Sequence, residues 1–152
     1  MAGRAGRPIG RVPAFWDTSA VVPLCVQQSM TPNAIALYKL YSVVVWWTTP
    51  VEIASALARL VRMKQINPAD CAKARKLANV LSDSWSVIQP SDRLRTKALQ
   101  LVDRYDLRAA DSLQLAAALE WCEGAPQGRG FLTADERLRQ AALLSGFDAE
   151  QM

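Results

Sequence analysis

The residues Phe15-Trp16-Asp17-Thr18-Ser19-Ala20-Val21-Val22 decide the fold, because a short apolar run ends there at a single carboxylate. Pro13 to Trp16 is predicted to be a strand, and Thr18 or Ser19 can cap the helix that follows it. Asp17 is therefore expected at the exit of a strand, where open α/β sheets bind their ligands.

Further strands are predicted along the chain, with helical segments between them. Val43 to Trp47 is β-branched and aromatic without alternation, as in a strand buried on both faces, so Trp46 and Trp47 are assigned to the core. Trp85 to Ile88 and Phe131 to Leu132 are two shorter candidates. Strands separated by helices indicate a parallel sheet that is covered on both faces. The sequence thus predicts one helix-rich α/β domain.

The first 12 residues differ from the rest of the 152-residue chain. Arg4, Arg7 and Arg11 lie there without the apolar stretch that a secretory signal needs. They account for three of the four net positive charges, so residues 13–152 carry only +1, which does not by itself indicate nucleic acid binding. We predict a basic flexible tail at 1–12 and a single domain at 13–148. No apolar run approaches the about 20 residues of a membrane span.

Cysteine and histidine usage narrows the chemistry. Cys25, Cys71 and Cys122 are an odd number without close pairing, which predicts reduced thiols and a cytoplasmic protein. The chain has no histidine, which excludes histidine-based nucleases, Ser-His-Asp hydrolases and nearly all zinc sites. Hydrolytic chemistry would have to use carboxylates, together with a hard metal ion.

Three further acids are expected near Asp17. Glu52 follows the second strand and Asp135 follows the last one, each at the start of a helix. Asp111 lies near the start of another helix and joins them if that helix packs over the same edge. Parallel strands end on one edge of a sheet, so these carboxylates are predicted to project into one crevice.

Each acid also has a structural explanation. Thr49-Pro50-Val51-Glu52 and Thr133-Ala134-Asp135-Glu136 match the capping-box pattern, and Asp is favourable in any first helical turn. The helical periodicity places Asp111 and Asp135 on the core-facing side, where an unpaired carboxylate is costly. Glu136 falls on the outer side and is assigned to capping.

A cluster of carboxylates without histidine or cysteine suits Mg²⁺ or Mn²⁺. Such an ion activates water for attack on a phosphodiester and stabilises charge on the phosphoryl oxygens. The predicted catalytic and metal-binding residues are Asp17, Glu52, Asp111 and Asp135. Ser19 and Thr133 are predicted to position a carboxylate or a water molecule beside them.

Four segments carry these acids in order along the chain. They are Asp17-Thr18-Ser19-Ala20, Thr49-Pro50-Val51-Glu52, Leu107-Arg108-Ala109-Ala110-Asp111-Ser112-Leu113-Gln114-Leu115-Ala116 and Phe131-Leu132-Thr133-Ala134-Asp135-Glu136-Arg137-Leu138. Together they resemble the successive motifs of PIN-domain ribonucleases, most closely the VapC-type toxins of toxin–antitoxin pairs. The resemblance runs from about Ala14 to Gly146. The basic tail and the short polar end after Gly146 depart from the pattern, which closes with a further strand.

The resemblance implies a PIN-like α/β fold, with a central parallel sheet of about four to five short strands and about seven flanking helices. It also implies a Mg²⁺- or Mn²⁺-dependent endoribonuclease that often cuts transfer or ribosomal RNA, with the acids matching Asp17, Glu52, Asp111 and Asp135 holding the metal. Members commonly form homodimers. A cognate VapB-like antitoxin usually inhibits them by inserting a C-terminal segment into the acidic site.

Arg59 is the candidate for contact with an RNA phosphate, because it lies two helical turns from Glu52 on the same face. A solvated surface arginine is the alternative. Six basic residues occur between Arg59 and Lys76 against Asp70 alone, and they either extend this contact or form a solvated helix face.

Two other functions are considered beside the nuclease. A PIN-like module that binds RNA or protein without cutting would be favoured by a missing acid, but all four are present. Phosphotransfer through Asp17 as nucleophile resembles receiver and haloacid-dehalogenase-like proteins. Here Ser19 stands in place of the second acid of their Asp-x-Asp signature.

Overall fold

A computed structural model describes residues 10–152 of the chain. Four parallel strands form one sheet in the order β3-β2-β1-β4. The strands are β1 (Val12–Trp16), β2 (Tyr41–Trp46), β3 (Ser86–Ile88) and β4 (Gly130–Leu132). The helices of the described residues are α1 (Thr18–Cys25), α2 (Thr31–Leu40), α3 (Thr49–Arg62), α4 (Pro68–Ser82), α5 (Asp92–Arg104), α6 (Ala109–Trp121) and α7 (Glu136–Ser145). The predicted α/β class with a parallel sheet and about seven helices is confirmed.

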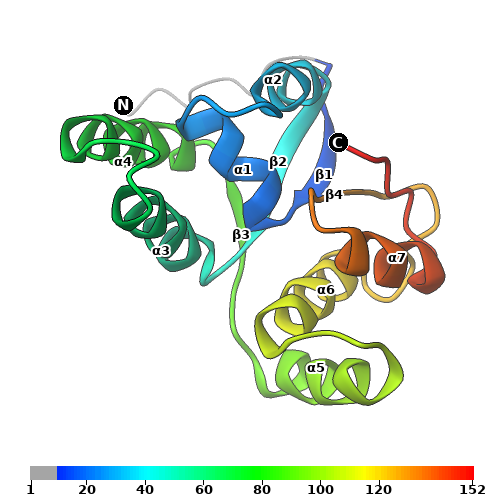
Figure 1. Cartoon of the computed structure of the whole chain (residues 1–152). Helices are drawn as coiled ribbons and strands as arrows, with labels where there is room; N and C mark the ends of the chain where they lie inside the picture. Colours follow the sequence, from blue (N-terminus) through cyan, green and yellow to red (C-terminus); the bar gives the residue numbers. More distant parts are fainter. Residues whose placement is uncertain (1–9) are drawn as a thin grey trace, which may run out of the picture.

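The helices cover both faces of the sheet, as Figure 1 shows. Alternate residues of the strands point to opposite faces, so Phe15 and Val44 join the core beneath α5, α6 and α7. Ala14, Trp16 and Val45 point the other way and pack with α1, α3 and α4. Two hydrophobic cores therefore lie back to back across the sheet.

The strand register aligns the carboxyl ends of the strands. Phe15 pairs with Val44 on one side and with Phe131 on the other. The Asp17 amide then donates to the Leu132 carbonyl at 2.9 Å, just beyond the end of β1. Residues that follow β1, β2 and β4 consequently share one edge of the sheet, which is the predicted location of the acids.

Two details of the predicted elements are wrong. Trp46 is buried in the core, but Trp47 lies beyond the end of β2 and is 54% exposed. The chain turns there, since α3 begins two residues later. The cap of α1 is Asp17 itself, whose side chain accepts from the Ser19 amide, instead of Thr18 or Ser19.

Both ends of the described chain are packed against the domain. Residues 1–9 of the predicted tail lie outside the described residues, whereas the Arg11 guanidinium stacks 4.5 Å from the Tyr38 ring centroid. At the other end, Gly146 adopts φ 107° and stops α7, and Phe147 enters the core. Two isolated parallel bridges, Gly130 with Asp148 and Thr133 with Gln151, pair the segment after Gly146 with β4 and the residue that follows it.

The three cysteines are buried and free. In residues 10–152, no helix has the length and apolar character needed to cross a membrane.

Candidate active site

Asp17 lies at the centre of the carboxyl edge of the sheet and is 5% exposed. One of its oxygens, Oδ2, accepts hydrogen bonds from the Ser19 hydroxyl and from the Thr133 hydroxyl, the latter at 2.8 Å. The two hydroxyls lie 3.1 Å apart. Burial raises the pKa of Asp17, and these hydrogen bonds oppose the shift. The structure therefore places Ser19 and Thr133, the two hydroxyl residues predicted beside the acids, on the central carboxylate.

Glu52 is half-buried in the first turn of α3. Its Oε2 accepts from Thr48 Oγ1 and from Gln114 Nε2, both at 2.9 Å. Burial, and then the charge of Asp17, raise the pKa of Glu52, while the hydrogen bond from Thr48 opposes them. The capping box that the sequence suggested is not formed, because the Thr49 hydroxyl is buried without a partner in the described residues. Glu52 faces the site instead of the helix end.

Asp111 lies in the first turn of α6 and is half-buried. Burial raises its pKa to about 6, and the charges of Asp135, Asp17 and Glu52 add to the shift in that order. The positive charge of Arg108 opposes them. Asp111 therefore feels the other three acids at once, which places all four in one electrostatic environment.

Asp135 occupies a different position from the one that the helical periodicity predicted. It is the N-cap of α7, and its Oδ1 accepts from the Leu138 amide at 2.8 Å. It is exposed, so the prediction that it looks toward the core is wrong. The error arose because α7 begins at Glu136, and a residue before the helix does not follow helical periodicity. Thr133, the predicted cap, bonds to Asp17 instead.

Glu136 does not cap α7, and it borders the same cavity as Asp111 and Asp135, so its assignment to capping alone is wrong. Its carboxylate pairs with Arg139 at 2.7 Å and accepts from Gln140 at 2.9 Å. The hydrogen bond from Arg139 is the main reason why the pKa of Glu136 is lowered to about 2. The charge of Glu136 is thus compensated by side chains of its own helix.

A cavity of about 320 Å³ opens over Asp111 and Asp135. Its wall also contains Asp106, Glu136 and two arginines, Arg108 and Arg137, of which Arg137 pairs with Asp106 at 3.5 Å. Arg108 immediately precedes α6, which carries Asp111, and Arg137 lies in the first turn of α7, which Asp135 caps. Each arginine therefore lies at the same helix start as one of these acids. The sequence reasoning missed them, although both stand inside the motifs that carry the acids.

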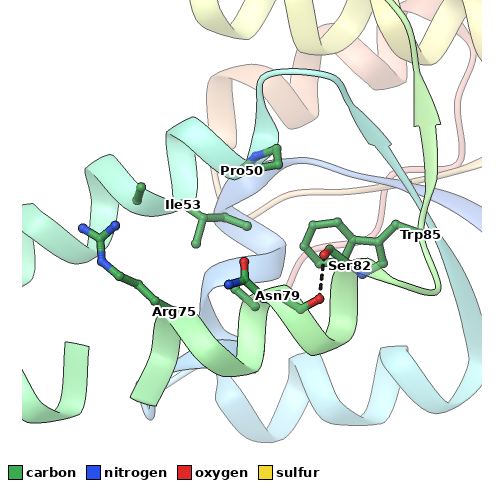
Figure 2. Close-up of a pocket in the computed structure, with 8 residues that line it drawn as sticks. Pro50, Ile53, Arg75, Asn79, Ser82 and Trp85 are labelled. Atoms are coloured by element: carbon green, nitrogen blue, oxygen red, sulfur yellow. Dashed lines mark hydrogen bonds between the residues drawn. The ribbon is translucent and has the colours of Figure 1, made fainter. Parts of the chain in front are cut away.

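A second cavity, of about 190 Å³, lies between α3 and α4 and does not include the acids. Figure 2 shows Arg75 at one end of it and Trp85 at the other, with Asn79 between them. Arg75 is one of the six basic residues noted in the sequence. Arg59, the predicted phosphate contact, is exposed on α3, and none of the cavities lined by the acids includes it.

The chemistry of the donor set fits a hard divalent cation. Carboxylate and hydroxyl oxygens are the ligands that Mg²⁺ and Mn²⁺ prefer. A cation would stabilise the charged form of Asp111, whose pKa is raised first by burial and then by the charges of the neighbouring acids. Within residues 10–152, however, no three acidic or cysteine side chains already surround a point closely enough to hold an ion. A bound ion would have to draw the side chains inward.

Several solved structures have a similar fold, and three of them are bacterial proteins. A toxin–antitoxin complex from Klebsiella pneumoniae is 14% identical, with a TM-score of 0.57 over 80% of this chain and 86% of that chain. VapBC2 from Rickettsia felis, bound to a promoter DNA fragment, is 10% identical, with a TM-score of 0.64 over 93% of this chain and 99% of that chain. FitAcB from Neisseria gonorrhoeae is 14% identical, with a TM-score of 0.59 over 89% of this chain and 96% of that chain. At these identities the likeness concerns the fold.

No curated protein matches the chain in sequence. The model of the PIN domain family, in contrast, matches residues 14–144, which include all four acids and every strand except the first two residues of β1. This chain belongs to the PIN domain family.

Proposed function

We propose that this protein is a metal-dependent endoribonuclease that hydrolyses RNA phosphodiester bonds. The observation that carries the proposal is that four acids gather at one edge of the sheet, where burial raises the pKa of Asp111 and the charges of Asp135, Asp17 and Glu52 add to that shift. A cation would stabilise the charged form of Asp111, which burial and the three neighbouring acids disfavour. Membership of the PIN family supports the same conclusion.

In this proposal Asp17, Glu52, Asp111 and Asp135 hold Mg²⁺ or Mn²⁺. The ion would activate a water molecule and stabilise charge on the phosphoryl oxygens. Ser19 and Thr133 fix Asp17 through its Oδ2, which leaves the carboxylate a single orientation. Arg108 and Arg137 flank the cavity over Asp111 and would bind the RNA phosphates that enter it. Arg59 would contact the RNA further along α3.

We further propose a toxin of the VapC type, which an antitoxin of the VapB type inhibits in the cytoplasm. One structural neighbour is named as a toxin–antitoxin complex and another as VapBC2, which supports this proposal. Transfer or ribosomal RNA is the proposed substrate, and a homodimer the proposed assembly. Co-expression with the product of an adjacent small gene, followed by purification through a tag on one partner, tests the antitoxin.

Cleavage of purified RNA tests the enzymatic proposal. The wild-type protein is incubated with total RNA and Mn²⁺ or Mg²⁺, beside Asp17→Asn and an EDTA control. Cleavage that depends on the metal and disappears in Asp17→Asn is expected. Cleavage that survives both controls would contradict a mechanism based on these carboxylates.

A PIN module that binds RNA or protein without cutting is the second candidate. One observation favours it, namely that Asp135 is exposed and already engaged as the cap of α7. This candidate predicts RNA binding or antitoxin binding that EDTA does not weaken. It also predicts no cleavage after any co-purified partner has been removed.

A further inference from the structure

The side chain of Gln114 joins the two helical layers at the acidic edge. It belongs to α6, on the α5–α7 side of the sheet, and its exposed fraction is 0%. Its Nε2 donates to Glu52 Oε2 at 2.9 Å and to Thr18 Oγ1 at 3.1 Å. Glu52 and Thr18 lie on α3 and α1, in the opposite layer. One buried amide therefore connects three helices beside the candidate active site.

The hydrogen bonds fix the orientation of this amide. An NH₂ group has two hydrogens, and both are used on the two acceptors. A flipped amide would turn its oxygen toward the Glu52 carboxylate, so only one orientation is compatible with the site. The carbonyl oxygen of the same amide is left unsatisfied, because Gln114 Oε1 is buried and has no donor among the residues from Gly10 onward.

This unpaired oxygen argues that Gln114 does more than fill space. An apolar side chain of similar volume would pack at this position without leaving a buried acceptor unsatisfied. The amino group is the part of Gln114 that makes contacts, and its charged acceptor is Glu52. Thr48 donates to the same Glu52 oxygen from the other side. Two donors on one oxygen restrict the rotation of the carboxylate.

We propose that Gln114 is a positioning residue that orients the Glu52 carboxylate toward a divalent cation and links that orientation to α1 through Thr18. The inference rests on the proposed metal-dependent function and assigns a further residue to the same site. Removing a hydrogen-bond partner of a metal ligand commonly weakens metal affinity by about 10–100-fold.

Calorimetric titration of the metal-free protein with Mn²⁺ tests the proposal. Gln114→Met keeps the length and volume of the side chain but removes both donors, and we expect its Mn²⁺ dissociation constant to rise by about 10-fold or more. Leu101→Ala, in the core beneath α5, is the matched control, because it weakens packing without touching the amide. Unchanged affinity in Gln114→Met, or an equal loss in Leu101→Ala, would overturn the proposal.

A measurement on the wild-type protein covers the case in which Gln114→Met does not fold. The side-chain amide signals of ¹⁵N-labelled protein are followed during a Mg²⁺ titration. Those of Gln114 should shift and saturate, whereas those of Gln65, which is exposed in the turn between α3 and α4, should stay in place. Metal binding that leaves the Gln114 signals unmoved would defeat this inference alone. A wild-type protein that binds neither ion would defeat the metal-dependent function and this inference with it.

Discussion

The Thr133 hydroxyl donates a 2.8 Å hydrogen bond to Asp17 Oδ2, although 116 positions of sequence separate the two residues. The bond connects the ends of β4 and β1, which are neighbours in the sheet. Ser19 lies within reach of both side chains, since its hydroxyl donates to Asp17 and lies 3.1 Å from the Thr133 hydroxyl. The Asp17 carboxylate is thus held by Thr133, which follows β4, and by Ser19, which lies on α1.

Thr133→Val should impair both stability and cleavage. The substitution keeps the shape of the side chain but removes a donor to a buried carboxylate, so we expect a loss of about 1–2 kcal/mol in the free energy of unfolding. RNA cleavage should fall by about 10-fold or more, because Asp17 loses its orientation. Urea unfolding and cleavage rates measure the two effects. Thr31→Val is the control, because its buried hydroxyl bonds to Pro23 and Gln28 away from the acids, and cleavage should survive there.

Asp111→Asn should stabilise the metal-free protein at neutral pH. The pKa of Asp111 is about 6 in the folded protein against an ordinary value of 3.8. The folded state therefore binds more protons between these two values, and its stability falls as the pH rises through them. Removing the charge should raise the free energy of unfolding by about 1 kcal/mol at pH near 7.5, after allowance for solvent screening. It should leave that free energy unchanged below pH of about 3.5.

Thermal unfolding in EDTA at both pH values measures this effect. The exposed residue Asp103 on α5 provides a matched substitution, and Asp103→Asn should leave the pH dependence unchanged. A gain in Asp111→Asn that persists at the acidic pH would point to a cause other than its charge.

The two adjacent tryptophans should respond differently to truncation. Trp46 is 4% exposed and Trp47 is 54% exposed. Trp46→Ala should cost about 3–5 kcal/mol of unfolding free energy because it opens a cavity in the core. Trp47→Ala should cost less than about 1 kcal/mol, as surface substitutions usually do. Chemical denaturation of the two variants measures these losses. Similar losses of unfolding free energy in both variants would contradict the exposure described for Trp47.

Arg108→Gln should weaken RNA binding more than Arg59→Gln does. Arg108 lies in the wall of the cavity over Asp111, whereas Arg59 is exposed on α3 outside it. We expect about a 10-fold weaker complex for Arg108→Gln, with a shallower salt dependence because one phosphate contact is lost. Both substitutions are introduced into the Asp17→Asn protein, which should not cleave RNA, and the RNA dissociation constants are measured at several salt concentrations. A larger effect at Arg59 would place the RNA along α3 instead.

The sequence was sufficient to predict the elements of the fold and the edge on which the acids lie. Asp17 follows an apolar run, and Thr49 before Pro50 indicates the start of α3. The exact end of a strand was harder to predict. Val43 to Trp47 has no alternation, and an unbroken apolar run does not reveal where a buried strand stops. Trp47 was misplaced for this reason.

The contacts inside the site depend on packing that a linear sequence does not display. Gln114 bonds to Glu52 and Thr18, which are 62 and 96 positions away, because the starts of α3 and α1 lie beside α6 at the end of the sheet. Its buried amide had no local signature that distinguished it from other polar residues in an apolar helix. Asp135 was correctly predicted to follow the last strand. Its predicted burial was wrong, because the start of α7 was predicted too early in the sequence.

The two outer edges of the sheet limit how copies of this chain can associate. On the β4 side, the segment after Phe147 forms backbone bridges at Gly130 and Thr133 and so covers that edge. On the other side, β3 has only three residues, which leaves a short row of free backbone groups. A continuous sheet shared between two copies would have little backbone to pair. Any homodimer should therefore form through helix surfaces, with each sheet remaining separate.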